Sequence, residues 1–430
     1  MRSTLLRTFA VVGLLLAGTA SNAQTIAITG GKVYGVNAAP IENATVLMRD
    51  GKIVAVGTSV SIPEGALRVD ASGKWVTPGI VNASTQLGAV EVGAVAATRD
   101  ANARGHDAIA AAFTVYEGLN PASQLIPAAR EDGITTVLVH PSNGLLAGQS
   151  AVVDLVSGST SDMVVRTSAA MVADLTDPRG AGTDSRGEML LRLREIFDDA
   201  RTYARRRADF DRAQTRTFAA SRLDLEALQP VLAGRLPLLV IVDKASDIQA
   251  ALKIARDFGL KIIIGGGAEA WMVAGELAAA RVPVLTGAMN NIPSSFNALG
   301  TRQENAALLR RAGVTVALIG NAGGGNEETF NVRNVRYEAG NAVAYGMTWD
   351  DALKAVTLAP AQIFGVADRV GTLEAGKVAN VVVWSGDPFE FSTRAEHVFV
   401  HGKEYHDVSR QDLLTQRYKT LPPDYTKSTP

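Results

Sequence analysis

The sequence predicts an α/β protein, a (β/α)8 barrel of the TIM type with a small β-sandwich formed by N- and C-terminal segments. Strand-like segments occupy both ends of the chain, and between them short apolar runs alternate with helix-like segments, as expected for a parallel sheet. The chain has 430 residues, 47% of them hydrophobic. This length and composition suffice for a large buried core in a barrel and a second β-rich unit.

The first 23 residues have the features of a secretory signal. Arg2 and Arg7 precede a short apolar stretch at 9–17, and Ser21-Asn22-Ala23 forms a small-x-small cleavage site. The apolar stretch is too short to cross a bilayer. We therefore expect cleavage near Ala23, a periplasmic or secreted mature protein, and no membrane span after cleavage.

Composition excludes several classes of function. The formal net charge is -1, and basic residues are spread along the chain, whereas a nucleic-acid partner requires a basic face. The chain has no cysteine, which excludes disulfides, a lipid anchor on cysteine and thiolate metal ligands.

The β-sandwich is expected to be composite, built from 24–78 and 366–408. The Asp50-Gly51 pair lies between two apolar runs, a strong signal for a tight β-hairpin. The polar segment 409–430 is predicted to be a partly ordered C-terminal tail.

The barrel is expected over 79–365. Its candidate strands are 135–139, 238–242, 261–264, 282–285 and 314–319. Its candidate helices are 188–214, 248–258, 270–280 and 305–312. Such alternation predicts strands whose carboxyl ends meet at one mouth of the barrel, where barrel enzymes carry their active sites.

Three groups of motifs resemble the amidohydrolase superfamily, in the branch around imidazolonepropionase-like enzymes. The first group is 50–57 (Asp-Gly-Lys-Ile-Val-Ala-Val-Gly) with 76–81 (Val-Thr-Pro-Gly-Ile-Val), and the second is 247–260 with 267–270 (Gly-Ala-Glu-Ala). The third group comprises 352–361, 371–377 and 381–384. The resemblance covers nearly the whole mature chain and implies hydrolysis of C–N bonds at a metal, usually zinc, held at the barrel mouth.

The same resemblance implies that the metal ligands are replaced. Ser84 and Gln86 occupy the positions of the His-x-His pair that ends the first strand. Asp243 and Gly266 correspond to the later histidines, and Asn321 to the aspartate that ends the last strand. Zinc favours imidazole, thiolate and carboxylate ligands, and an amide cannot act as a general base. We therefore predict no cofactor and treat these five positions as candidates for substrate binding.

The histidine count supports this prediction without any alignment. Of five histidines, three lie in the C-terminal strand region, which leaves His106 and His140 for the barrel. Two imidazoles cannot build a His-rich zinc site. A site with oxygen ligands alone stays open, and its obvious carboxylates are Glu91, Asp243 and Glu269.

His140 follows the candidate strand 135–139, so we expect it at the barrel mouth. It is a candidate for substrate binding and, with Asp243 and Asn321, for catalysis, although a hydrogen-bonded structural histidine is the more frequent case. The segment 144–150, which contains Gly144, Gly148 and Gln149, is interpreted as an ordinary loop after this strand.

Three hypotheses on function follow. The first is a non-catalytic or strongly altered relative, a pseudoenzyme without a metal, that binds a small amide-like molecule. The second is an active hydrolase of small amides, cyclic amides or dipeptides that uses an atypical site. The third is a structural subunit in a homo-oligomer or a hetero-oligomer with an active amidohydrolase relative.

Overall fold

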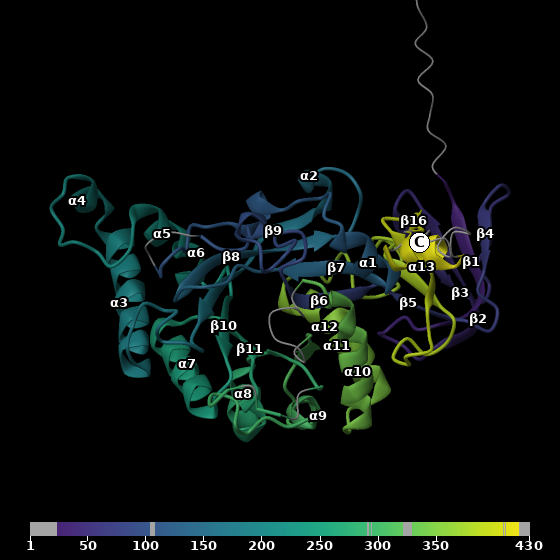
Figure 1. The fold of residues 1–430 in the computed structure, drawn as a ribbon. Helices are drawn as coiled ribbons and strands as arrows, with labels where there is room; N and C mark the ends of the chain where they lie inside the picture. The colour runs from purple at the N-terminus through teal and green to yellow at the C-terminus, as the bar shows by residue number, and fades with distance from the viewer. Residues whose placement is uncertain are drawn as a thin grey trace, which may run out of the picture.

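The structure is a computed structural model that describes residues 24–103, 108–289, 292–293, 295–320, 329–406, 408 and 410–420. It contains two sheets of eight strands each, and the predicted fold class is confirmed. In Figure 1 the sandwich strands gather at the right-hand side of the molecule, beside the barrel and its helices.

The sandwich sheet joins the two ends of the chain. Its strands are β1 (Ile26–Val33), β2 (Ile41–Arg49), β3 (Lys52–Gly57), β4 (Leu67–Asp70), β5 (Trp75–Pro78), β14 (Val381–Trp384), β15 (Ala395–Val400) and β16 (Lys403–Tyr405). They follow the order β16-β15-β14-β5-β1-β2-β3, with β4 paired to β1. The antiparallel pair β5–β14 connects the N-terminal strands to the C-terminal ones.

The predicted hairpin is present between β2 and β3. Asp50 and Gly51 both have positive φ, 53° and 71°. A two-residue turn of this hand matches the twist of the paired strands, and only residues that tolerate left-handed φ can form it. The Asp-Gly pair thus fixes the register of the two strands.

The second sheet is a nearly closed barrel. Its strands are β6 (Ile80–Thr85), β7 (Ile134–Val139), β8 (Leu146–Asp154), β9 (Val164–Asp174), β10 (Leu238–Val242), β11 (Ile262–Gly266), β12 (Val284–Thr286) and β13 (Val316–Leu318), which pair in sequence order. Alternate residues such as Leu239, Ile263 and Leu285 fill the interior as one buried cluster. This filled interior makes the barrel a packed core, as such barrels require.

One strand departs from the ideal parallel pattern. Strand β8 runs antiparallel to both β7 and β9. Only residues 140–145 separate β7 from β8, and a parallel crossover needs a dozen or more residues. The interpretation of 144–150 as a loop was therefore wrong from Leu146 onward, because Gly148 and Gln149 belong to the ladder of β8.

Most of the helices surround the barrel. The described helices are η1 (Ala96–Thr98), η2 (Val115–Gly118), α1 (Leu125–Glu131), α2 (Thr160–Met163), α3 (Arg186–Arg205), α4 (Arg207–Asp211), α5 (Arg222–Ala227), α6 (Gln229–Leu232), α7 (Ala245–Phe258), η3 (Ala270–Val273), α8 (Ala274–Ala280), α9 (Asn305–Arg311), η5 (Val332–Asn334), α10 (Val335–Ala344), α11 (Trp349–Ala355), α12 (Leu358–Ile363) and α13 (Arg410–Tyr418).

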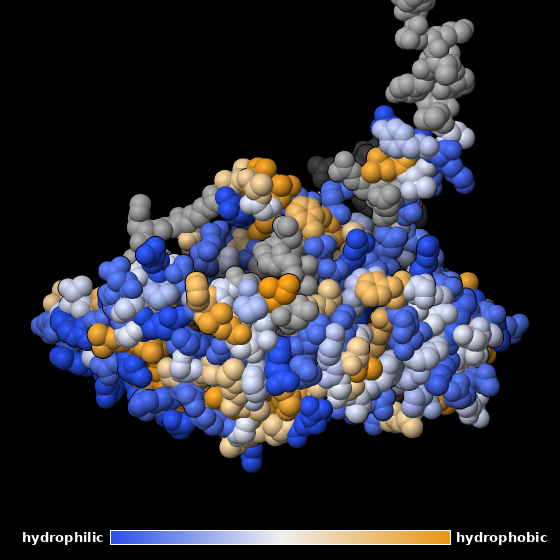
Figure 2. Space-filling view, turned by 60° about the horizontal axis from the view of Figure 1, so that its bottom comes forward, coloured by the Kyte–Doolittle hydropathy of each residue, from blue (hydrophilic) through white to orange (hydrophobic). Residues whose placement is uncertain are grey.

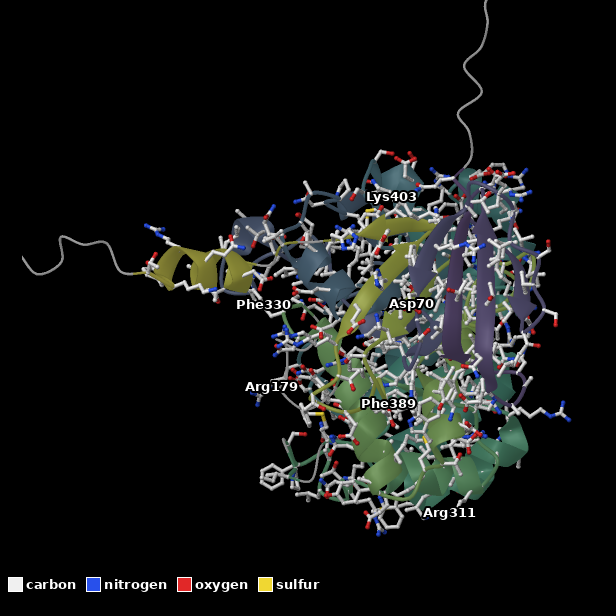
Figure 3. All side chains as sticks on the ribbon, turned by 90° about the vertical axis from the view of Figure 1, so that its right-hand side faces the viewer. Asp70, Arg179, Arg311, Phe330, Phe389 and Lys403 are labelled. Atoms are coloured by element: carbon white, nitrogen blue, oxygen red, sulfur yellow. The ribbon has the colours of Figure 1, made fainter. Side chains whose placement is uncertain are left out.

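Two helical segments differ from the predictions. The long charged helix predicted over 188–214 is two helices, because Arg206 leaves helical geometry (φ -123°, ψ 33°) between α3 and α4. The predicted tail contains the helix α13, which extends away from the rest of the molecule in Figure 3.

Aromatic side chains pack where the sandwich meets the barrel helices. Trp349 of α11 lies 4.6 Å from Tyr34 and 5.2 Å from Phe389, measured between ring centroids. Figure 3 shows Phe389 at this junction. A second contact is polar: Asp154 of β8, fully buried, accepts from His401 Nε2 at 2.7 Å. Both contacts anchor the sandwich to the barrel.

The outer surface is mixed in character. On the face shown in Figure 2, hydrophobic side chains form separate small patches among hydrophilic ones. Within the described part of the chain, every helix is too short or too polar to cross a membrane.

Candidate functional site

The predicted site residues lie at the carboxyl ends of barrel strands. Ser84 is the penultimate residue of β6, and His140 directly follows β7. Asp243 directly follows β10, and Gly266 ends β11. Since these four strands are joined through one continuous sheet and run in the same direction, the four residues share the mouth of the barrel.

Ser84 and His140 form a direct pair. Ser84 Oγ lies 3.0 Å from His140 Nε2, and His140 Nδ1 lies 3.0 Å from the carbonyl oxygen of Pro141. A carbonyl oxygen only accepts, so Nδ1 is the donor in the contact with Pro141, and Nε2 faces the serine hydroxyl. The histidine is buried, with 5% of its surface exposed. The sequence placed both residues but did not predict that they touch.

The backbone around this pair is firmly held. Asn82, fully buried, donates from Nδ2 to the carbonyl oxygen of Val332 at 2.9 Å and accepts from the Ser84 N–H at 3.1 Å. The N–H of His140 donates to the carbonyl oxygen of Thr85 at 3.0 Å. These bonds fix the ends of β6 and β7 relative to each other.

Asp243 and Gly266 form the second pair. The Oδ1 atom of Asp243 accepts from the Ala268 N–H at 3.2 Å. A Cβ atom added to Gly266 would lie 2.6 Å from that same oxygen, closer than real Cβ contacts come. Gly266 also has φ of +83°, a conformation that favours glycine. The glycine therefore makes room for the carboxyl group of Asp243.

The carboxyl group of Asp243 has a raised pKa. The largest cause is burial, which disfavours the charged form, and the negative charges of Asp174 and Glu269 add to the effect. The hydrogen bond from Ala268 acts in the opposite direction and is outweighed. Asp243 makes no ion pair with Lys244 in the structure, so the neighbouring lysine does not neutralise it.

Asp174 is a site residue that the sequence prediction missed. It ends β9, and its Oδ1 accepts from the N–H and hydroxyl of Thr176 at 2.8 and 2.6 Å. The signal was available, because Asp174 follows the apolar run 169–173 just as Asp243 follows 238–242. Strand β9 itself had not been predicted.

Two predicted carboxylates serve the fold instead. Glu269 accepts from the Ala245 N–H at the start of α7 and from the Gly300 N–H, both at 2.9 Å. Glu91 accepts from the Gln124 N–H at 2.9 Å. Both side chains therefore hold backbone segments, which accounts for them without a metal ion.

Comparison with known proteins shows the family. A model of the amidohydrolase family matches residues 245–405. The chain is similar to an amidohydrolase structure from Thermotoga maritima with a TM-score of 0.80 and 27% identity, over 89% of this chain and all of that one. This chain belongs to the amidohydrolase superfamily.

Curated relatives point to one branch of the superfamily, the imidazolonepropionase-like one. An imidazolonepropionase from Mesorhizobium japonicum is 26% identical over 404 residues, which cover 80% of this chain and 87% of that protein. The amidohydrolase tasK from Hapsidospora irregularis is 24% identical over 88% of this chain. This chain spans only 42% of the length of tasK.

The described residues of this amidohydrolase do not fit a His-based zinc centre. Among them, no group of three or more histidine, aspartate or glutamate side chains is arranged to hold a metal ion, and the whole chain lacks cysteine. Two residues of interest, Asn321 and His106, lie outside the described residues. Gln86 is mostly buried at 8% exposure, and its side chain makes no hydrogen bond within the described chain.

Proposed function

We propose that this amidohydrolase binds a small cyclic amide at its barrel mouth without a His-based metal centre. The observation that carries the proposal is the carboxyl group of Asp243, whose pKa is raised by burial and by the negative charges of Asp174 and Glu269. No arginine or lysine is among the groups that shift this pKa. A raised pKa extends to higher pH the range in which a carboxyl group carries its proton.

A protonated carboxyl group matches the polar edge of a ring amide. The acid offers one O–H donor and one carbonyl acceptor, whereas an ionised carboxylate only accepts. In a lactam or cyclic imide, the C=O and N–H point to the same side of the ring because the amide is cis. The two groups can then form a pair of hydrogen bonds with Asp243.

Other groups at the same end of the barrel suit an amide ligand. Gln86 has a side-chain amide without a protein partner among the described residues, and such a group both donates and accepts. Gly266 keeps the space beside Asp243 free of a side chain. These features support a ligand-binding pocket with few, specific polar contacts.

A second candidate function rests on the Ser84–His140 pair. Its 3.0 Å separation and the fixed tautomer of His140 are those of a nucleophile and its general base. In this mechanism the serine oxygen attacks the amide carbon while Nε2 takes the hydroxyl proton. The proton then passes to the leaving nitrogen, and water hydrolyses the acyl-enzyme. The product would be a ring-opened amino acid.

The decisive experiment combines metal analysis with binding of a lactam panel to the purified mature protein. We expect no stoichiometric zinc or manganese, and binding of a cyclic imide such as hydantoin that weakens as pH rises through the pKa of Asp243. Asp243→Asn should keep binding and lose the pH dependence, because an amide side chain donates and accepts at any pH. Asp243→Ala should abolish binding, and Lys253→Gln on the outside of α7 is the matched control. Stoichiometric metal, or binding unaffected by Asp243→Ala, contradicts the proposal.

Ser84→Ala separates the two candidates. A ligand-binding protein keeps its affinity for hydantoin in this variant, since the alanine removes only one hydroxyl. A serine hydrolase loses turnover by several orders of magnitude, and the parent protein gains the mass of a phosphonate probe on Ser84. Absence of both turnover and labelling in the parent excludes the second candidate.

Export and assembly are further proposals from the sequence. We propose cleavage near Ala23 and a periplasmic or secreted mature protein, which N-terminal sequencing of the protein from its native host tests. A homo-oligomer or a hetero-oligomer with an amidohydrolase relative is tested by measuring the mass of the native complex.

A further inference from the structure

A cavity lies at the opposite end of the barrel from the candidate site. Its volume is about 610 Å³, within the range of small-molecule pockets. It opens beside the residues that precede β10, β11 and β12, namely Arg235, Lys261 and Arg281. Those are the amino-terminal ends of the strands, so this cavity is separate from the mouth where Asp243 lies.

The charges around this cavity have one sign. Arg166, Arg256 and the three basic residues already named line it, and no acidic residue is among the described residues that do. Arg235, Arg256, Lys261 and Arg281 make no ion pair with any described carboxylate. Four basic side chains thus remain without a protein counter-charge.

Helix termini explain only part of this charge. Arg256 lies in the last turn of α7, and Arg281 is the residue that caps the carboxyl end of α8. Each helix end carries about half a negative charge, so two ends offset about one of the five positive charges. An excess of about four positive charges remains around the cavity. The side chains of Arg235, Arg256, Lys261 and Arg281 are exposed, so their attraction for an anion is screened by salt.

One of the basic groups, Arg166, is held in place by hydrogen bonds. Arg166 donates from Nε to the carbonyl oxygen of Ser168 and from Nη1 to that of Phe364, both at 3.0 Å. This uses two of the five N–H groups of a guanidinium. The side chain of Lys261 passes Gly234, with its Cε 3.8 Å from where a Cβ on that glycine would stand. Gly234 directly precedes Arg235 in the chain.

Apart from Gln362, the remaining side chains of the lining are apolar. Leu260, Val282, Pro283 and Ile363 contribute to it, and the structure buries or half-buries each of them. A fully polar anion such as phosphate would leave this surface wet, whereas an apolar body covers it and gains the free energy of burial. We propose that this cavity is a binding site for an organic anion with an apolar body, represented by a medium-chain carboxylate.

The test is calorimetric titration of the full-length mature protein with dodecanoate below its micelle concentration. We expect one bound molecule per chain and an affinity that falls as salt rises. Dodecyltrimethylammonium, with the same tail and the opposite charge, and acetate, with the charge and no tail, should show no binding. The double variant Arg235→Gln/Lys261→Gln should weaken the binding of dodecanoate by tenfold or more. Lys253 lies on the same helix as Arg256 but is paired with Asp257, so Lys253→Gln should leave the affinity for dodecanoate unchanged.

Three outcomes overturn the proposal. They are equal binding of the cationic analogue, an unchanged affinity in the double variant, and a dimer in solution that dissociates in the double variant while dodecanoate never binds. The last outcome makes the basic cavity a contact between copies. Far-ultraviolet circular dichroism and an unchanged urea-unfolding midpoint show that the double variant is folded, and they keep this test independent of the mouth.

Discussion

Replacing Gly266 with alanine tests the geometry of the barrel mouth directly. The alanine Cβ would stand 2.6 Å from Asp243 Oδ1, and the backbone there has φ of +83°. A left-handed alanine costs about 1–2 kcal/mol. The carboxyl group must also move away and lose its 3.2 Å hydrogen bond from Ala268, which costs about 1 kcal/mol more. We expect Gly266→Ala to lower the free energy of unfolding by about 2–3 kcal/mol.

The matched control is Gly275→Ala in α8, where an added Cβ meets no atom within 4 Å and φ is not positive. In a helix interior this change stabilises by about 0.5–1 kcal/mol. Urea unfolding followed by circular dichroism measures both variants, and hydantoin titration measures the mouth. Gly266→Ala should lose stability and ligand affinity together. A Gly266→Ala protein within about 0.5 kcal/mol of the parent, with its affinity retained, refutes the account of Asp243 given above.

Three further outcomes are expected. The pKa of Asp243 in the folded state is above its ordinary 3.8. Between the unfolded and folded pKa values, the folded state holds a proton that the unfolded state has released, so stability falls as pH rises through this range. In urea unfolding from pH 4 to 8, the free energy of unfolding of Asp243→Asn should therefore rise relative to that of the parent as pH rises. Glu374 has a pKa lowered to about 2 by its hydrogen bonds, first of all the one from Asn37, so its stabilising contribution is present above pH 4.5 and is lost as pH falls through about 2. Because the group is partly exposed, Glu374→Gln should lower the free energy of unfolding by at most about 1 kcal/mol at pH 7, and the difference from the parent should shrink as the pH approaches 2. Gly133→Ala should lower the melting temperature more than Gly73→Ala does. Both glycines have positive φ, but only at Gly133 would the Cβ meet the ring of buried Trp384, at 2.3 Å. Equal losses in the two variants contradict this.

Local signals predicted the parts of the fold that local chemistry determines. The Asp50-Gly51 turn is one such part, because its backbone conformation depends on those two residues alone. The strand β10 is another, since 238–242 is a continuous apolar run buried in a parallel sheet. In both cases sequence and tertiary structure agree.

Strand β8 could not be predicted in the same way. Gly148 and Gln149 look like loop residues, and they become a strand only because β9 supplies antiparallel partners, including the pair Gln149–Met171. This pairing depends on tertiary structure and not on propensity. Missing β9 also hid Asp174, and with it one cause of the raised pKa of Asp243.

The contact between Ser84 and His140 depends on a local irregularity. The pairing of β6 with β7 shifts register between Asn82 and Thr85, and such a bulge changes the direction in which a side chain points. From the period of a regular strand, one expects Ser84 and Gln86 to act as a pair on one face. In the structure, Ser84 Oγ instead lies 3.0 Å from His140 Nε2.

The two ends of the barrel differ in charge in a way that links the two proposals. At the carboxyl end, the negative charge of Asp174 adds to the cost of ionising Asp243, and no basic side chain is among the groups that shift the pKa of Asp243. At the amino end, Arg235 and Lys261 have no described carboxylate partner. The packed barrel core lies between them, so the groups at the two ends are too far apart to form an ion pair. Each end must therefore be satisfied by solvent, by a proton or by a ligand of its own, a neutral hydrogen-bonding amide at one and an organic anion at the other.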